Sequence, residues 1–192
     1  MNKKAQGFTI VELLIVIVVI AILAAISIAA YTNIQQRAKN TAIINAASQS
    51  LKMIQAYIAE YGTYPVTGNA CITVDSECQT NTGSPGSKIL ANSTFDSRLA
   101  AIGVLPKSVP TEGDRWYGIT YSYSPAATFN GESQPGLLIY HLQGQNKQCG
   151  LPNVMAQVTT GTYDTSPYGY SSSHSGLNKT ECRISIPGPA HS

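Results

Sequence analysis

The chain has 192 residues, which is enough for one domain of ordinary size and an additional segment. Its 12 Lys and Arg side chains and 10 Asp and Glu side chains give a formal net charge of +2, so the composition does not favour a broad basic surface for nucleic acid. Charged residues make up only 11% of the chain, and Gly, Ser, Thr, Asn and Tyr are frequent in its second half. This composition favours an exported, loop-rich domain over a cytosolic enzyme.

An apolar run occupies residues 8–30 and is interrupted only by two hydroxyl side chains and one carboxylate, Glu12. As a helix it would be about 34 Å long, enough to cross the roughly 30 Å hydrocarbon core of a bilayer. Lys3 and Lys4 precede the run, so the positive-inside rule predicts a cytoplasmic N-terminus and an external remainder.

Two general explanations of this run compete with a more specific one. A secretory signal could be cut after Ser27-Ile28-Ala29, but such signals have a shorter apolar centre of about 7 to 15 residues. A plain signal anchor explains the length and the orientation. It leaves Glu12 unexplained, because an isolated carboxylate in hydrocarbon costs roughly 2.5 to 3.5 kcal/mol.

The stretch KKAQGFTIVELLIVIVVIAILAAI resembles the N-terminus of the type IV pilin and type II secretion pseudopilin family. In that family a basic leader ends in glycine, and the mature protein begins with phenylalanine and has glutamate as its fifth residue. The corresponding positions here are Gly7, Phe8 and Glu12. The resemblance implies that a prepilin peptidase cuts after Gly7 and methylates the new amino group of Phe8. Glycine suits a cleavage site because the missing Cβ lets a protease approach the backbone.

The charge of Glu12 suggests a role in assembly. Cleavage would place an ammonium group on Phe8, and opposite charges about 4 Å apart attract strongly in a medium of low dielectric constant. Glu12 could reach the Phe8 amine of its own helix, one turn away, or the amine of a neighbouring subunit. The resemblance favours the second pairing, which would set the register of a filament.

The helix is expected to continue through residues 31–61, where neither Gly nor Pro occurs. Apolar residues recur there at spacings of three and four, which predicts an amphipathic helix packed under a sheet; they are Ile44, Ala47, Leu51, Ile54, Ile58 and Tyr61. Gly62 and Pro65 are expected to end the helix.

Short elements are predicted beyond Pro65. The stretch STFDSRLAAIGVLP reads as a helix with Ser93 or Thr94 as its N-cap, and its expected buried residues are Phe95, Leu99, Ile102 and Leu105. Strands are expected at residues 116–123, 136–142, 154–158 and 182–186, with Tyr117, Ile119, Tyr121 and Tyr123 on one face of the first. The sequence therefore predicts an α+β fold, with one long helix followed by an antiparallel sheet.

Four cysteines in an exported chain indicate disulfides, and three pairings are possible. We favour Cys71 with Cys78, which lie at either end of a small loop rich in turn residues, and Cys149 with Cys182. Many pilins hold a variable C-terminal loop with such a disulfide, so the resemblance supports the second pairing. A zinc site is not expected, because the sequence has no close C-x-x-C pairs.

No pattern of metal ligands or catalytic partners accompanies His141, His174 or His191. We therefore expect no catalytic residue, no metal, no cofactor and no enzymatic activity. The Tyr- and Ser-rich loop with Tyr163, Tyr168 and Tyr170 is either an adaptable binding surface or a solvated variable loop.

Together these features predict four segments: a cleaved leader (1–7), a membrane and filament-core helix (8–30), its amphipathic continuation (31–61) and an external head (62–192). The resemblance implies the subunit of a surface filament for adhesion or motility, stored in the inner membrane with its head outside. Its implied partners are other copies of itself, a prepilin peptidase and an inner-membrane assembly platform. A secretion pseudopilin, a minor or DNA-uptake pilin, and a membrane-anchored binding domain that does not polymerise are the alternatives.

Overall fold

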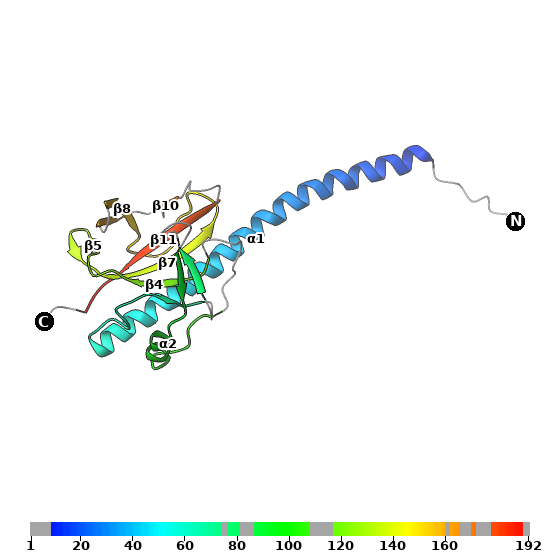
Figure 1. Ribbon diagram of the computed structural model, residues 1–192. Helices are drawn as coiled ribbons and strands as arrows, with labels where there is room; N and C mark the ends of the chain where they lie inside the picture. The colour runs from blue at the N-terminus through cyan, green and yellow to red at the C-terminus, as the bar shows by residue number, and fades with distance from the viewer. Residues whose placement is uncertain are drawn as a thin grey trace. The chain divides into compact units, whose positions relative to one another are not determined.

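The computed structural model of the chain describes residues 9–73, 77–80, 87–107, 117–159, 162–165, 170–171 and 178–189. The chain separates into two compact units, Met1–Ala38 and Lys39–Ser192, and each is described on its own. The elements (Figure 1) are α1 (Ile10–Tyr61), β1 (Ala70–Cys71), β2 (Glu77–Thr80), β3 (Ser87–Leu90), α2 (Ser93–Ala100), β4 (Thr120–Tyr123), β5 (Thr128–Phe129), β6 (Glu132–Ser133), β7 (Gly136–Gln143), β8 (Met155–Thr159), β9 (Thr162–Thr165), β10 (Tyr170–Ser171) and β11 (Lys179–Ile186).

The long helix α1 has 52 residues and ends where the sequence predicts. Its length follows from the absence of Gly and Pro, the two residues least favourable inside a helix. Gly62 follows the last helical residue with φ +66°, and its N–H donates to the Ile58 carbonyl at 2.9 Å. This left-handed residue is a common way of ending a helix, and it confirms the predicted role of Gly62.

The predicted apolar stripe of α1 is mostly buried. Four of its residues lie in the core of the head: Ala47, Leu51, Ile54 and Ile58. Ile44 is only partly buried, and the prediction is wrong for Tyr61, which is 53% exposed. The Tyr61 ring lies 4.6 Å from the Tyr57 ring one turn earlier, so it covers the helix surface instead of entering the core. The buried face is wider than predicted, because it also includes Ile43, Ala46 and Tyr57.

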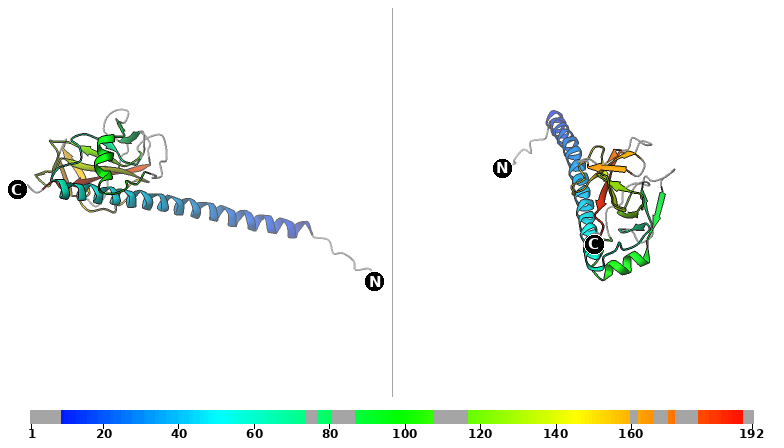
Figure 2. Two further views of the ribbon diagram at one scale, coloured as in Figure 1. Left: turned by 90° about the horizontal axis from the view of Figure 1, so that it is seen from below. Right: turned by 90° about the vertical axis from the view of Figure 1, so that its left-hand side faces the viewer.

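A five-stranded sheet in the order β1-β4-β7-β11-β10 forms the centre of the head, and all its neighbouring strands are antiparallel. The longest ladder joins β7 to β11 over eight residue pairs, from Gly136↔Ile186 to Gln143↔Lys179. The last strand of the chain thus lies inside the sheet, between β7 and β10 (Figure 2). The predicted α+β class with an antiparallel sheet is confirmed.

Two smaller sheets complete the described strands. β2 and β3 form an antiparallel hairpin, and β6-β5-β9-β8 form a four-stranded sheet in which β5 and β9 run parallel. These strands were not predicted, except for β8, because most have only two to four residues and show no alternation. The first predicted strand is also shorter than expected: it begins at Thr120, not at residue 116.

The hydrophobic core lies between α1 and one face of the five-stranded sheet. Alternate residues of the two central strands supply that face: Leu138, Tyr140 and Leu142 from β7, and Cys182, Ile184 and Ile186 from β11. Of the four residues predicted to share one strand face, Ile119 and Tyr121 are buried, whereas Tyr117 and Tyr123 are partly exposed. Two tyrosine hydroxyl groups donate hydrogen bonds inside the core: Tyr121 to the Val66 carbonyl at 2.9 Å, and Tyr140 to the Cys149 carbonyl at 2.5 Å.

The short helix α2 begins one residue earlier than predicted. Its N-cap is Asn92, not Ser93 or Thr94, because the Asn92 side-chain oxygen accepts the N–H groups of Thr94 and Phe95, each at 3.1 Å. Phe95 and Leu99 are buried as expected. The other two expected residues, Ile102 and Leu105, lie beyond the helix end; Leu105 is buried and Ile102 is partly buried.

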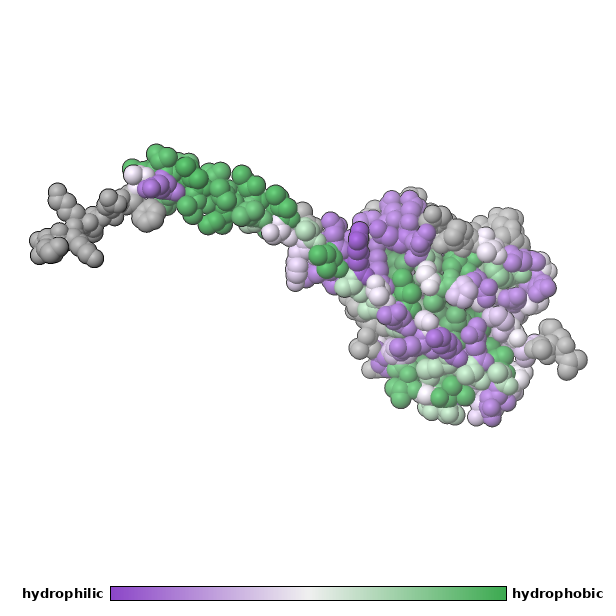
Figure 3. Space-filling model, turned by 180° about the vertical axis from the view of Figure 1, so that it is seen from behind, coloured by the Kyte–Doolittle hydropathy of each residue, from purple (hydrophilic) through white to green (hydrophobic). Residues whose placement is uncertain are grey.

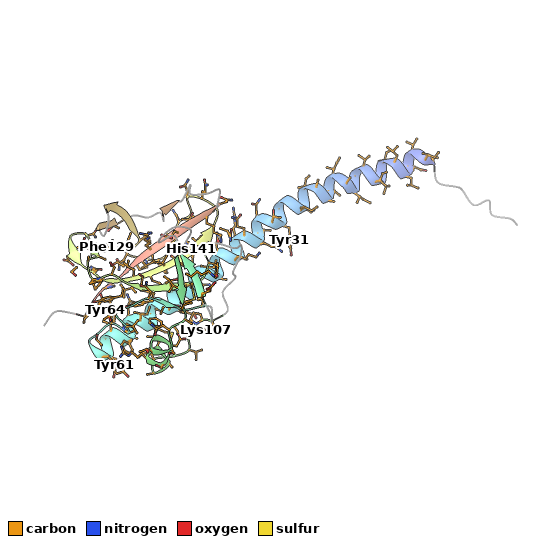
Figure 4. The ribbon with its side chains drawn as sticks, viewed as in Figure 1. Tyr31, Tyr61, Tyr64, Lys107, Phe129 and His141 are labelled. Atoms are coloured by element: carbon orange, nitrogen blue, oxygen red, sulfur yellow. A yellow bond between two sulfur atoms is a disulfide. The ribbon has the colours of Figure 1, made fainter. Side chains whose placement is uncertain are left out.

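The opposite face of the sheet carries a second, smaller apolar cluster. Leu137 of β7 packs there with Ala127, Phe129 and Met155, which lie in or beside the four-stranded sheet. Phe129 is labelled on this side in Figure 4. The head therefore covers both faces of its central strands.

Candidate assembly site

The helix start contains a reciprocal pair of hydrogen bonds between Thr9 and Glu12. Glu12 Oε2 accepts the Thr9 N–H at 2.9 Å and the Thr9 hydroxyl at 2.7 Å, and the Glu12 N–H approaches Thr9 Oγ1 at 3.3 Å. This is a capping box, which satisfies N–H groups that have no partner within the helix. This capping box was not predicted, although Thr-x-x-Glu before an apolar run is its usual signal.

The cap gives Glu12 a role within a single molecule, because a negative charge in the first turn is favourable to the helix dipole. Both hydrogen bonds from Thr9 go to the same carboxylate oxygen. The two residues that the resemblance assigns to processing, Gly7 and Phe8, lie outside the described residues. Cleavage after Gly7 and the pairing of Glu12 with a Phe8 amine therefore stay predictions.

The apolar stem, residues 8–30, exposes its side chains around its described surface. The large apolar side chains from Val11 to Ile28 are each 46% to 66% exposed, and green hydrophobic residues cover this segment in Figure 3. Ser27 is compatible with this apolar surface, because its hydroxyl donates a hydrogen bond to the Leu23 carbonyl at 2.7 Å. By length and composition, α1 is the one helix in the described part of the chain that could cross a membrane.

Such a surface needs a cover from outside the molecule. Monomeric soluble proteins rarely expose contiguous apolar patches larger than a few hundred Å². A helix satisfies its backbone hydrogen bonds internally, so lipid tails or other apolar helices are equally suitable surroundings.

Two disulfides join the four cysteines in the pairs favoured from the sequence. Cys71 pairs with Cys78 across seven residues, and Cys149 pairs with Cys182 across 33 residues. All four residues are fully buried. The second disulfide attaches the stretch that follows β7 to the central strand β11, and both disulfides suit an exported protein.

A buried polar cluster that was not predicted from the sequence connects β7 and β11. Glu181 Oε2 lies 3.1 Å from His141 Nε2, and Glu181 Oε1 accepts from Arg183 Nε at 2.6 Å. The Glu181 side chain is fully buried. Burial raises its pKa, but the hydrogen bonds and charges of His141 and Arg183 outweigh burial and lower the pKa to about 2. Figure 4 labels His141 on β7.

The one sequence signal for this cluster is the alternation of polar and core residues along β11. Lys179, Glu181, Arg183 and Ser185 alternate with residues of the core, a pattern typical of a strand with one solvated face. In the structure all eight residues of β11 are buried. A charged group buried on that face needs a partner, and Glu181 is bonded to His141 and Arg183.

The remaining candidates form no second site within the part of the chain that the structure describes. Within the described ranges, no group of three His, Cys, Asp or Glu side chains could hold a metal ion. His174 and His191 lie outside the described residues, as do the side chains of the predicted binding loop apart from Thr165.

The N-terminal part of the chain matches a known protein family. Residues 2–28 fit the family model described as the prokaryotic N-terminal methylation motif. The chain is also 30% identical over 119 residues to the fimbrial protein EcpC of Eikenella corrodens, an alignment that covers 59% of this chain and 78% of that protein. The chain belongs to the type IV pilin family.

Other pilins match over a shorter region. The type IV major pilin protein PilE1 of Neisseria gonorrhoeae is 35% identical over 65 residues, which cover 34% of this chain and 39% of that pilin. A fimbrial protein of Neisseria meningitidis serogroup B is similar to the same extent, with 38% of its length covered. No solved structure gives a significant match.

Proposed function

We propose that this pilin is a structural subunit of a type IV pilus-like filament at the bacterial cell surface. The observation that carries the proposal is the exposed apolar stem, which begins with a capped carboxylate and continues into a helix that forms part of the head core. Lipid could cover the stem before assembly, and the stems of other subunits could cover it afterwards.

Processing precedes assembly in this proposal. The leader, residues 1–7, is removed after Gly7, and Phe8 becomes the methylated first residue. The match of residues 2–28 to the methylation motif supports this step. Before cleavage the precursor spans the inner membrane once, with Lys3 and Lys4 in the cytoplasm and the head outside.

Glu12 provides the register during assembly. Its Oε2 caps its own helix through Thr9, and its second oxygen is available to the Phe8 ammonium group of a neighbouring subunit. The membrane segment exchanges lipid for equally apolar helices, so extraction by an assembly platform needs no large loss of hydrophobic contact. An unpaired amine in the filament core would oppose this exchange.

The head, residues 62–192, faces outwards and supplies the surface for adhesion or motility. Its described residues show a packed core closed by disulfides, which suits a structural and binding role. In this proposal the protein is not an enzyme, and it needs no cofactor.

Sheared filaments test the proposal most directly. Filaments sheared from cells should contain this protein, and its intact mass should equal that of a chain that starts at N-methylated Phe8 with two disulfides. A mass that begins at Tyr31 or retains the leader would contradict the processing. Absence of the protein from sheared filaments, with the processed form present in membranes, would favour a non-polymerising anchor.

A further inference from the structure

The ladder between β7 and β11 has two faces with different kinds of facing side chains. On the core face the pairs are mostly apolar, as in Leu138↔Ile184. On the other face His141 lies directly opposite Glu181. His141 is the only side chain of β7 that can carry a positive charge, so the position of Glu181 along β7 is distinctive.

The apolar pairs do not select one register by themselves. A shift of β11 by one residue would turn its core side chains to the other face, and burial of the core excludes that shift. A shift by two residues keeps every side chain on its own face. It places Ile184 opposite Tyr140 in one direction or Gly136 in the other, so the core face of the ladder stays without a charge.

The buried polar cluster of His141, Glu181 and Arg183 distinguishes the observed register from both shifts. In the observed register Glu181 Oε2 lies 3.1 Å from His141 Nε2. A two-residue shift would place Glu181 opposite Ile139 in one direction. In the other direction it would place Glu181 opposite the neutral Gln143 and Arg183 opposite His141. Either shift separates a buried carboxylate from its partner on the other strand, which is unfavourable.

The register of β11 also decides which thiol groups meet. The Cα atoms of Cys149 and Cys182 are 5.7 Å apart, within the range that a disulfide can join. Two residues of a strand span about 7 Å, so the shift would move Cys182 away from its position beside Cys149. The thiols of Cys149 and Cys182 would then be left to react with Cys71 and Cys78, which gives the non-native connectivities.

We propose that the cluster of His141, Glu181 and Arg183 determines the register of β11 on β7 and thereby directs Cys182 to Cys149. Buried charged groups of this kind can make a structure unique even where they add little to its stability. This role concerns the folding of the head, so it does not depend on the formation of a filament.

Oxidative refolding of the reduced, full-length protein in detergent tests this role. The variant His141→Leu/Glu181→Leu/Arg183→Leu replaces the whole cluster, so no member is left without its partner, and such apolar replacements are often neutral or stabilising. Non-reducing peptide mapping should find that the share of non-native disulfides rises by about fivefold or more over the wild type, because the apolar pairs accept shifted registers. A cluster that only stabilised the head would leave the disulfides native in this variant.

Thr180→Val is the matched control on the same strand. The Thr180 hydroxyl donates to the Gly144 carbonyl at 2.6 Å and accepts the Lys147 N–H at 3.0 Å, so its loss weakens the attachment of β11 but keeps the cluster. This control should refold with native disulfides, and an equal rise of non-native disulfides in both variants would overturn the proposal. So would native disulfides in the triple variant.

A second variant decides the question if the triple variant does not fold. The exchange His141→Glu/Glu181→His keeps an acidic side chain opposite a basic one in the observed register. Native disulfides in the exchange variant support the proposal, and non-native disulfides overturn it.

Discussion

Two carboxylates, Glu12 and Glu181, lie where an isolated charge is unfavourable, and their neighbours stabilise them differently. Glu12 precedes an apolar helix and is bonded by Thr9 within the same turn. Glu181 lies inside the head and is held between His141 and Arg183 on two strands. The first interaction is local in sequence, whereas the second depends on the pairing of β7 with β11.

Glu12→Gln should separate the two roles of this carboxylate. Glutamine can still accept the Thr9 hydrogen bonds of a capping box, but it carries no charge for a neighbouring amine. We expect normal cleavage and membrane insertion but a loss of filaments of more than a hundredfold, because an unpaired buried charge costs about 3 to 5 kcal/mol. The yield of sheared filaments relative to total membrane pilin is the measurement.

Thr9→Val is the matched variant for Glu12→Gln. It removes the hydroxyl of the cap but keeps the carboxylate, and it should weaken the helix start by about 1 kcal/mol while filaments still form. If Glu12→Gln assembles normally and Thr9→Val does not, the cap is the essential feature and the proposed register role is wrong.

Glu181 should make the stability of the head depend on acid pH. Its pKa falls from an ordinary value of 4.5 to about 2 on folding, so its contribution is complete above pH 4.5 and is lost as the pH falls through 2. This corresponds to about 3 kcal/mol of unfolding free energy. Near-UV circular dichroism during denaturation of the full-length protein in detergent would measure it.

Glu181→Gln should reduce that dependence and destabilise the head at pH 7 by about 3 to 5 kcal/mol, because the buried guanidinium of Arg183 loses the opposite charge of the Glu181 carboxylate. Glu60→Gln, at an exposed position of α1, is the control and should change little. Equal acid sensitivity of the wild type and of Glu181→Gln would mean that other groups cause the loss of stability.

Among the secondary-structure elements, the end of α1 and the start of β11 have different causes. α1 ends at a glycine in a left-handed conformation, a local property that the sequence reveals. β11 is longer than the predicted strand, residues 182–186, because the polar residues before Cys182 also pair with β7 and β10.

Gly62→Ala should lower the stability of the head by about 1 to 2 kcal/mol. The space around Gly62 is open, so the effect would come from its φ of +66°, which a Cβ disfavours. Gly68 also has open space but no positive φ, and Gly68→Ala should be neutral. Thermal unfolding of both variants gives the comparison, and equal melting temperatures would show that the last turn of α1 adapts without strain.

The two disulfides should differ in their contribution to stability. On the chain-entropy model, the link across 33 residues contributes about 3 to 4 kcal/mol and the link across seven residues about 2 kcal/mol. The double variant Cys149→Ser/Cys182→Ser should therefore unfold at lower denaturant than Cys71→Ser/Cys78→Ser, and limited proteolysis should cut it between residues 150 and 181. The reverse order of stability would indicate that packing around Cys71 and Cys78 outweighs loop length.

For the molecule as a whole, the sequence predicts the local features and misses the long-range ones. The family, the long helix, its end at Gly62 and the main strands follow from motifs, periodicity and turn residues. The Glu181 cluster, the four-stranded sheet and the wider buried face of α1 depend on contacts between distant segments, which no local pattern encodes. The Asn92 cap was missed for a smaller reason, since three adjacent residues can all cap a helix.

The position of β11 between β7 and β10 also makes the closing of the head a late event in folding. Lys179–Ile186 follow all the other described strands in the sequence, and they pair with a strand that ends at Gln143. Until they pair, β7 has an uncovered edge, the disulfide of Cys149 is not closed and one side of the core is exposed. A head without β11 in place therefore has the exposed strand edge and apolar surface that favour aggregation.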